Sequence, residues 1–158
     1  KGAEKVIINT CAVENPKFIR EASDNFGSST IVVCIDVKKK FFSGEVVWSN
    51  SGSKSSKYSP KDFAKLIEEN GAGEIIIQSI NKDGTMSGYD LDLIKEISTA
   101  VTIPVVALGG AGNLDHMIEA YKKGFASALA AGSFFVFQGP KKGVLINYIE
   151  NSDLSFFR

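Results

Sequence analysis

Two glycine-rich segments stand at the positions where parallel α/β proteins carry their active sites. Gly109-Gly110-Ala111-Gly112 directly follows the apolar residues 104–108, and Ala131-Gly132-Ser133 follows the small residues of 126–131. Glycine lets backbone N–H groups come close to an anion, and the N-terminus of a following helix adds a positive dipole. Each segment alone would be explained by a tight turn. Two of them in consecutive units favour a phosphate-binding cradle.

A single carboxylate ends a continuous apolar segment. Asp36 follows residues 31–35, so we expect its side chain at the same edge of a sheet as the glycine segments. Partial burial would raise its pKa and suit it to general acid or base catalysis. The alternative is an aspartate that caps a helix or braces a loop. Asp83 lies in Asp83-Gly84-Thr85, a sequence typical of a turn, where its carboxylate can simply order the loop.

The sequence gives less support for a function of the other charged residues. Lys5 and Glu74 stand where their strands begin, at the opposite edge of the sheet, where they either pair across its floor or form a solvated rim. His116 lies off the apolar stripe of its helix, so we expect it to be exposed and not catalytic. The run 38–40 is three lysines, which we expect to be solvated, although a basic loop near the site would attract phosphate.

The elements that must position these residues follow one repeated pattern of strand, loop and helix. Apolar or β-branched runs predict strands over residues 5–10, 30–37, 74–80, 104–108 and 126–131. Between them, amphipathic stretches predict helices that begin at Asn15-Pro16, Ser59-Pro60, Asp90 and Asn113, each with a capping residue in place. Ser59 and Asp62 approximate a capping box. Residues 42–48 predict a small hairpin around Ser43-Gly44, and residues 50–59 a polar loop.

About five βα units without a linker predict a parallel sheet covered by helices. The fold class is therefore α/β, either an open doubly wound sheet or a (β/α)8 barrel. A complete barrel needs eight units and about 250 residues. We therefore expect one partial barrel domain over residues 1–158, with roughly the last five units. The chain opens with Lys1 and not with Met, so we expect a fragment or a processed protein.

The composition excludes several classes of partner and site. The chain has 158 residues with 18 basic and 18 acidic side chains, so it has no global field to hold nucleic acid or an anionic membrane. Cys11 and Cys34 are isolated, so we expect two reduced cysteines and neither a zinc site nor a disulfide framework. We also expect no metal and no cofactor. No apolar run approaches the roughly 20 residues that span a bilayer, and no signal peptide is visible. We therefore expect a cytoplasmic protein.

Several long motifs resemble one family. The sequence is similar to the cyclase (HisF-type) subunit of imidazole glycerol phosphate synthase from about Lys1 to Phe135, in unbroken order. The motifs that carry this resemblance are residues 8–16 (INTCAVENP), 71–74 (GAGE), 79–90 (SINKDGTMSGYD) and 109–112 (GGAG). The resemblance implies a (β/α)8 TIM barrel, of which this chain supplies strands four to eight.

The resemblance also implies a function in histidine biosynthesis. A glutaminase subunit, the partner in a heterodimer, releases ammonia that crosses the barrel. The ammonia meets a bis-phosphorylated ribulosyl-aminoimidazole carboxamide, and ring closure with C–N cleavage gives imidazole glycerol phosphate and an aminoimidazole carboxamide ribotide. By resemblance, Asp36 is one of two catalytic aspartates, and Lys5 and Glu74 are ammonia-gate residues. The residues that match phosphate-binding positions are Asn9, Thr10, Asp83, Gly84, Gly109, Gly110, Ala131 and Gly132.

Three departures from the family pattern favour an alternative. Asn81 stands where the family usually has Asp, Leu108 where Ser is common, and Ile7 where a small polar residue lines the channel. Residues 137–148 resemble a paralogous branch linked to surface-polysaccharide genes. In that branch the subunit would deliver ammonia, as a conduit or scaffold, to a sugar amidotransferase. A third possibility, a phosphate-binding flavin enzyme, is disfavoured by the strand that ends in Asp36 and by the Asp83-Gly84-Thr85 loop.

Overall fold

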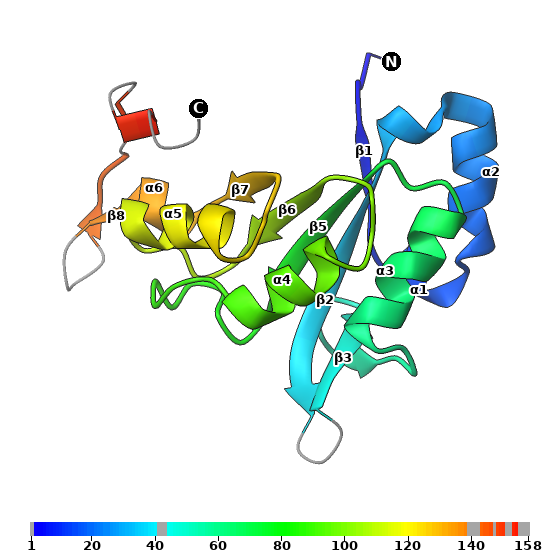
Figure 1. Ribbon diagram of the computed structural model, residues 1–158, viewed down its shortest axis with the longest axis horizontal. Helices are drawn as coiled ribbons and strands as arrows, with labels where there is room; N and C mark the ends of the chain where they lie inside the picture. The colour runs from blue at the N-terminus through cyan, green and yellow to red at the C-terminus, as the bar shows by residue number, and fades with distance from the viewer. Residues whose placement is uncertain (1, 41–43, 139–142, 147, 151–152, 155–158) are drawn as a thin grey trace.

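A computed structural model describes residues 2–40, 44–138, 143–146, 148–150 and 153–154. Five parallel strands lie side by side in the order in which they occur along the chain (Figure 1). They are β1 (Val6–Ile8), β2 (Ile31–Lys40), β5 (Glu74–Ser79), β6 (Val105–Leu108) and β7 (Ala128–Ala130). This sequential order is the connectivity of a (β/α) barrel, whereas a doubly wound sheet reverses its order at a switch point. The fold is a partial (β/α)8 barrel, as predicted.

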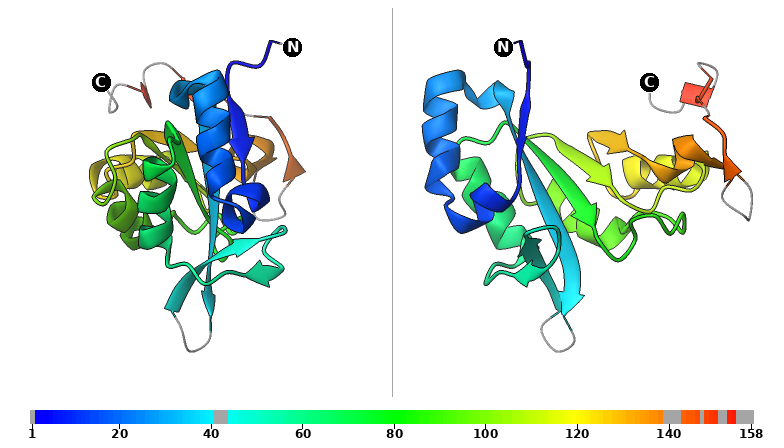
Figure 2. Two further views of the ribbon diagram at one scale, coloured as in Figure 1. Left: turned by 90° about the vertical axis from the view of Figure 1, so that its right-hand side faces the viewer. Right: turned by 180° about the vertical axis from the view of Figure 1, so that it is seen from behind.

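The longer helices, α2 to α5, lie together on one face of this sheet (Figure 2). The bounds of all helices are α1 (Thr10–Glu14), α2 (Lys17–Phe26), η1 (Ser28–Thr30), α3 (Pro60–Glu69), α4 (Leu91–Ser98), α5 (Leu114–Lys122) and α6 (Ser133–Val136). Three predicted caps are confirmed. The side chains of Ser59, Asp90 and Asn113 accept hydrogen bonds from the backbone N–H groups three residues later.

The predicted start of the first helix is wrong. The strand ends at Ile8 and the chain turns at once into α1, so Asn15 closes α1 instead of capping α2. Pro16 is then the N-cap of α2, without a side-chain cap. After β7 the chain forms the short helix α6, which begins at Ser133 directly after the second glycine segment. It is followed by β8 (Phe137–Gln138), which pairs with β9 (Gly143–Val144) in a separate two-stranded ribbon.

A hairpin extends one strand beyond the predicted limit. β2 continues to Lys40 and pairs there with β3 (Gly44–Ser49), which runs antiparallel to it. β3 in turn pairs with β4 (Lys54–Ser55), inside the segment that the sequence predicts as a polar loop. Phe42 and Ser43 of the predicted turn lie outside the described residues. β2 therefore pairs with β1 along its first half and with β3 from Asp36 onward.

The core lies between the sheet and the helices. Alternate residues of β5, Ile75 and Ile77, are at most 2% exposed and pack with Phe63 of α3 and Ile97 of α4 in one apolar cluster. The intervening residues of β5 face the opposite side of the sheet. On that side, at the edge strand β1, Ile7 is 60% exposed. We call this side the open face. None of the described helices is long and apolar enough to cross a bilayer.

Candidate active site at the carboxyl ends of the strands

Four side chains form a row across the open face near the carboxyl ends of the strands. Asp36 pairs in register with Gln78 on β5, Gln78 with Leu108 on β6, and Leu108 with Ala130 on β7. Val33, Ile35 and Val37 of β2 belong to the core beneath the helices, so alternation turns Asp36 to the open face. With strands about 4.8 Å apart, the row spans roughly 14 Å. This length suits an extended small molecule.

Asp36 is half-buried in this row. Burial raises the pKa of its carboxyl group above the ordinary value, and the charge of Asp83 adds to the effect. Hydrogen bonds from Cys34 and Asn9 act in the opposite direction without cancelling it. The Cys34 Sγ donates to Asp36 Oδ1 at 3.6 Å. A carboxyl group with a raised pKa on an open face has the properties that general acid or base catalysis requires.

The two glycine segments meet around one small hollow. It is lined by Asp83, Gly84, Leu108, Gly109, Gly110, Ala111, Ala131, Gly132 and Ser133. Its volume is about 10 Å³, which is room for about one water molecule. A larger anion would therefore sit at the mouth of the hollow. The structure thus brings together the loops after β6 and β7 with Asp83 and Gly84 from the loop after β5, the residues that the resemblance groups at phosphate-binding positions.

The glycines of the first segment are required by close backbone packing. Gly110 has φ +105°, and a Cβ there would lie 2.2 Å from the carbonyl oxygen of Gly88. The Gly88 N–H also donates to the Gly110 carbonyl at 2.8 Å. A Cβ on Gly109 would lie 2.9 Å from the Ser79 carbonyl oxygen. The tight-turn explanation therefore accounts for Gly109 and Gly110 whether or not an anion binds there.

Gly132 is different because nothing in the fold requires glycine at its position. Its φ is −104°, and a Cβ built there meets no atom within 4 Å. Its backbone precedes α6, which has only four residues and so contributes a small dipole. The end of β7 just before it is fixed by Tyr89, whose hydroxyl donates to the Ala130 carbonyl at 2.9 Å. Gly132 therefore leaves open space on the rim of the hollow.

Asn9 and Thr10 lie at the other end of the row, next to β2. Asn9 Nδ2 donates to the Cys34 carbonyl at 2.9 Å, and Thr10 Oγ1 donates to Asn9 Oδ1 at 3.2 Å. Thr10 Oγ1 also accepts from the Asn50 N–H at 3.0 Å. Both side chains thus bond within the protein. A phosphate bound here would depend on backbone N–H groups or would have to displace these bonds.

Lys5 and Glu74 form an ion pair at the opposite edge of the sheet. Lys5 Nζ contacts Glu74 Oε2. The Lys5 side chain is 52% exposed and that of Glu74 is 21% exposed. The pair bridges the amino ends of strands that are separated by β2, so it lies across the floor of the open face. Lys5 and Glu74 therefore do pair, and the pair is exposed to solvent.

Two residues near the hollow were missed or misjudged from the sequence. His116 is half-buried and not exposed, because its Nδ1 accepts from the Gly112 N–H at 3.2 Å and its ring lies close to Gly88. Sequence reasoning gave no role to Gln78, whose Nε2 lies 3.4 Å from Asp83 Oδ2. The feature of the sequence that could have indicated a role for Gln78 is its polar side chain inside the otherwise apolar strand 74–80. Among the described residues, no group of three His, Cys, Asp or Glu side chains is placed to hold a metal ion.

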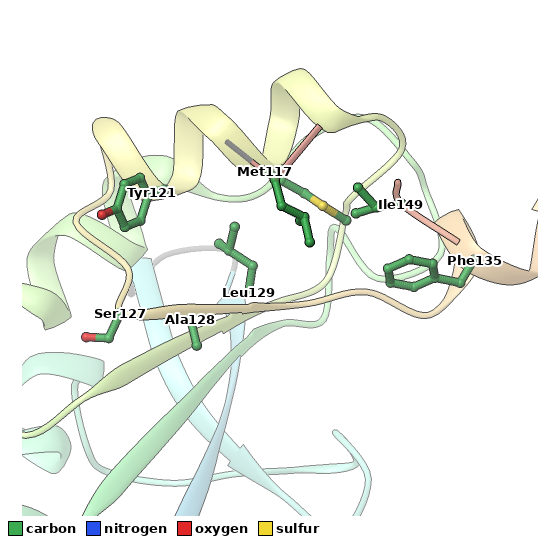
Figure 3. A pocket seen from close by; sticks show the side chains of 8 residues that line it. Met117, Tyr121, Ser127, Ala128, Leu129, Phe135 and Ile149 are labelled. Atoms are coloured by element: carbon green, nitrogen blue, oxygen red, sulfur yellow. The ribbon is translucent and has the colours of Figure 1, made fainter. Parts of the chain in front are cut away.

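A larger hollow lies away from this row. It has a volume of about 270 Å³ and is lined by α5, β7 and the segment that follows (Figure 3). Met117, Leu129 and Ile149 point into it, and most of its lining is apolar. The residues that line it include no carboxylate, imidazole, amine or thiol, so its size alone does not mark it as a catalytic site.

The comparisons with known proteins agree with the fold. A family described as histidine biosynthesis protein matches residues 1–139. The chain is 48% identical, over 87% of its length, to imidazole glycerol phosphate synthase subunit HisF of Chlorobium phaeobacteroides, of which it covers 54%. It is 47% identical, over 87% of its length, to the same subunit of Chlorobaculum parvum, with 54% of that protein covered.

A further relative, in Pseudomonas aeruginosa, is named provisionally as subunit hisF2 of the same synthase. It is 44% identical over 93% of this chain, which covers 59% of that protein. The fold defines a partial (β/α)8 barrel, and the chain belongs to the histidine biosynthesis protein family. Within that family it is similar to HisF-type subunits. The chain spans about half the length of these relatives.

Proposed function

We propose that this chain forms part of an ammonia-dependent cyclase subunit of imidazole glycerol phosphate synthase. The observation that carries the proposal is the row on the open face, with a half-buried Asp36 at one end and a hollow lined by Gly109 and Gly132 near the other. The span of roughly 14 Å between the ends leaves room for a substrate with a phosphate at one end and its reacting atoms beside Asp36.

Each part of the row has a defined task in this reaction. Backbone N–H groups of the loops after β6 and β7 hold one phosphate of the bis-phosphorylated substrate, with Gly84 on the rim. Asp36 moves a proton as ammonia closes the imidazole ring and the C–N bond breaks. Its raised pKa keeps its protonation equilibrium closer to neutral pH than that of an exposed aspartate. Asn9 and Thr10 would contribute to a second phosphate site at the Asp36 end of the row.

The opposite edge of the sheet would receive the ammonia. We propose a heterodimer with a glutaminase subunit, which docks where Lys5 and Glu74 pair. The pair lies at the amino ends of the strands, so ammonia released there would cross the sheet's open face to reach Asp36. Loss of the pair in Lys5→Ala should impair turnover with glutamine more than turnover with added ammonia, because only the first depends on docking and entry.

The test of the cyclase proposal is Asp36→Asn in a form of the protein with a complete barrel. The substitution keeps size and polarity but removes the carboxyl group. Ammonia-dependent formation of imidazole glycerol phosphate should fall by at least about a hundredfold, the scale of a lost general acid or base. Substrate affinity, measured by calorimetry, should change by less than threefold. Asp115→Asn, at an exposed position in the first turn of α5, is the matched control and should leave turnover unchanged. Unchanged turnover in Asp36→Asn would remove Asp36 from the mechanism.

A second function is favoured by one residue of the row. Leu108 places an apolar side chain between Gln78 and Ala130, where the family commonly has Ser. An apolar group there gives no hydrogen bond to a polar substrate, which fits a subunit that only delivers ammonia to a sugar amidotransferase. A protein with this function would bind a glutaminase subunit and support glutamine-dependent amination of a sugar. It would form no imidazole glycerol phosphate from ammonia, whereas the cyclase would.

A further inference from the structure

A thiol lies beside the proposed catalytic carboxyl group. Cys34 and Asp36 are two residues apart on β2, so both face the open side of the sheet. Cys34 Sγ donates to Asp36 Oδ1 at 3.6 Å, and the Cys34 side chain is buried. Cys11, the other cysteine, is exposed. Burial and the neighbouring Asp36 raise the pKa of the Cys34 thiol to about 12. Cys34 therefore stays protonated at neutral pH and keeps a hydrogen to donate.

The backbone that carries this thiol is itself fixed from the neighbouring strand. Asn9 Nδ2 donates to the Cys34 carbonyl at 2.9 Å. Thr10 Oγ1 donates to Asn9 Oδ1, and the Asn50 N–H donates to Thr10 Oγ1. This chain of hydrogen bonds begins in the turn after β3 and holds the backbone of Cys34. Asn9 also bonds to the Asp36 carboxyl group and lowers its pKa, so the Cys34 S–H acts on Asp36 beside the Asn9 amide.

Among the described residues, few charged groups act on the Asp36 carboxyl group. Within the described residues, Asp83 is the charged group whose field acts most on the Asp36 carboxyl. On β2 itself, alternation places Lys38 on the same face, and its Nζ lies 5.0 Å from the ring centroid of Trp48 on β3. The in-register neighbours on β3 and β5 are Trp48 and Gln78, which carry no charge.

We infer that Cys34 is a positioning residue for Asp36. Its S–H donates to Oδ1 and holds the carboxyl group in the orientation in which it exchanges a proton with the substrate. This inference rests on the proposed function. Cys34 is not itself a proton donor to the substrate, and it stays inert because its thiol is buried and protonated. Its contribution is the direction and the protonation equilibrium of its neighbour.

The test compares two variants of nearly equal size, Cys34→Ala and Cys34→Ser, in a complete-barrel form of the protein. Both open similar space beside Asp36, but only serine restores a donor. The Asp36 pKa is read by NMR from ¹³C-labelled aspartate, and its signal is identified by its loss in Asp36→Asn. The pKa in Cys34→Ala should exceed that in Cys34→Ser by about 0.5 to 1 unit, the effect of one hydrogen bond on a carboxylate. Val32→Ala, on the same face one layer below, is the control and should leave the Asp36 pKa at its unsubstituted value.

Turnover with ammonia gives a second, independent readout. The limb of the pH profile of kcat/KM that reports Asp36 should move with the NMR value, and Cys34→Ser should recover most of the activity that Cys34→Ala loses. Equal Asp36 pKa values in the two variants, or a stationary limb, would overturn the role of Cys34. Absent turnover in the unsubstituted protein would overturn the proposed function and the catalytic part of this inference. The NMR comparison would even then decide whether Cys34 holds Asp36.

Discussion

Substitution of alanine for single glycines distinguishes a glycine that the stability of the fold requires from a glycine that the proposed phosphate site requires. In Gly110→Ala the new residue must adopt φ +105°, which costs about 1–2 kcal/mol for an L-residue. Its Cβ would lie 2.2 Å from the Gly88 carbonyl oxygen, so the two backbones must move apart. This movement breaks the hydrogen bond from Gly88 to Gly110, a loss of about 1 kcal/mol. Gly110→Ala should therefore lower the free energy of unfolding by about 2–3 kcal/mol.

Gly132→Ala should leave stability almost unchanged. Its backbone already has a φ that alanine accepts, and the added Cβ meets no atom within 4 Å. The free energy of unfolding should change by less than about 0.5 kcal/mol. The methyl group, however, would occupy open space on the rim of the hollow, where the phosphate is proposed to sit. Phosphate affinity should fall at least about tenfold, which is about 1.4 kcal/mol.

The assay is urea unfolding together with calorimetric titration of glycerol phosphate into a complete-barrel form of the protein. With a slope of roughly 1–3 kcal/mol/M, the urea midpoint of Gly110→Ala should drop by about 0.7–3 M, and that of Gly132→Ala should stay in place. Unaltered phosphate affinity in a folded Gly132→Ala variant would refute the assignment of this hollow to a phosphate. An unchanged midpoint in Gly110→Ala would refute the packing argument.

Three further predictions concern stability and association. Burial raises the Asp36 pKa, so the folded state disfavours the carboxylate, and Asp36→Asn should be more stable than the unsubstituted protein. The difference in free energy of unfolding should be absent well below pH 4, grow as the pH rises through the folded pKa and then level off. Urea titrations at several pH values would measure it. Partial burial on its own raises the Glu68 pKa, but three hydrogen bonds to Glu68 Oε1, from the Thr102 N–H, the Thr102 hydroxyl and the Ile103 N–H, together outweigh it and lower the pKa. The stabilisation by Glu68 should be present above about pH 4.3 and be lost as the pH falls through the folded pKa. Glu68→Ala should lose about 1–2 kcal/mol at pH 7 and nothing further on acidification, as urea titrations would show. In the described part of the chain β1 pairs only with β2 and β7 only with β6, so both outer strands have an unpaired side. The 158-residue chain alone should therefore self-associate in sedimentation velocity. A monomer at all concentrations would contradict this prediction.

Local features of the sequence predicted much of this fold. The caps at Ser59, Asp90 and Asn113 depend on residues three positions apart, and all three are formed. The order of the five parallel strands follows from a repeated βα pattern in which short connections leave little choice of neighbour. The sequence predicted Asp36 at the carboxyl end of its strand, because it closes an apolar run. A continuous apolar run does not fix the face that each side chain takes, so the position of Asp36 on the open face comes from the structure.

Contacts between distant segments were beyond sequence reasoning. His116 was expected to be exposed because its own helix gives no sign of a partner, and its burial comes from Gly88 and Gly112. The extension of β2 to Lys40 depends on pairing with β3, which no local pattern of lysines indicates. The bond between Cys34 and Asp36 depends on side-chain orientation as well as strand phase. These features need tertiary geometry.

The most direct test of the central claim is an amide NMR titration of a complete-barrel form with the bis-phosphorylated substrate. A single ligand that spans the row must contact residues at both ends of the row. The account predicts that the amide signals of Gly109 and Gly132 and those of Cys34 and Asp36 shift together, with a single dissociation constant. Shifts confined to one of these two groups, or two groups with different dissociation constants, would contradict it.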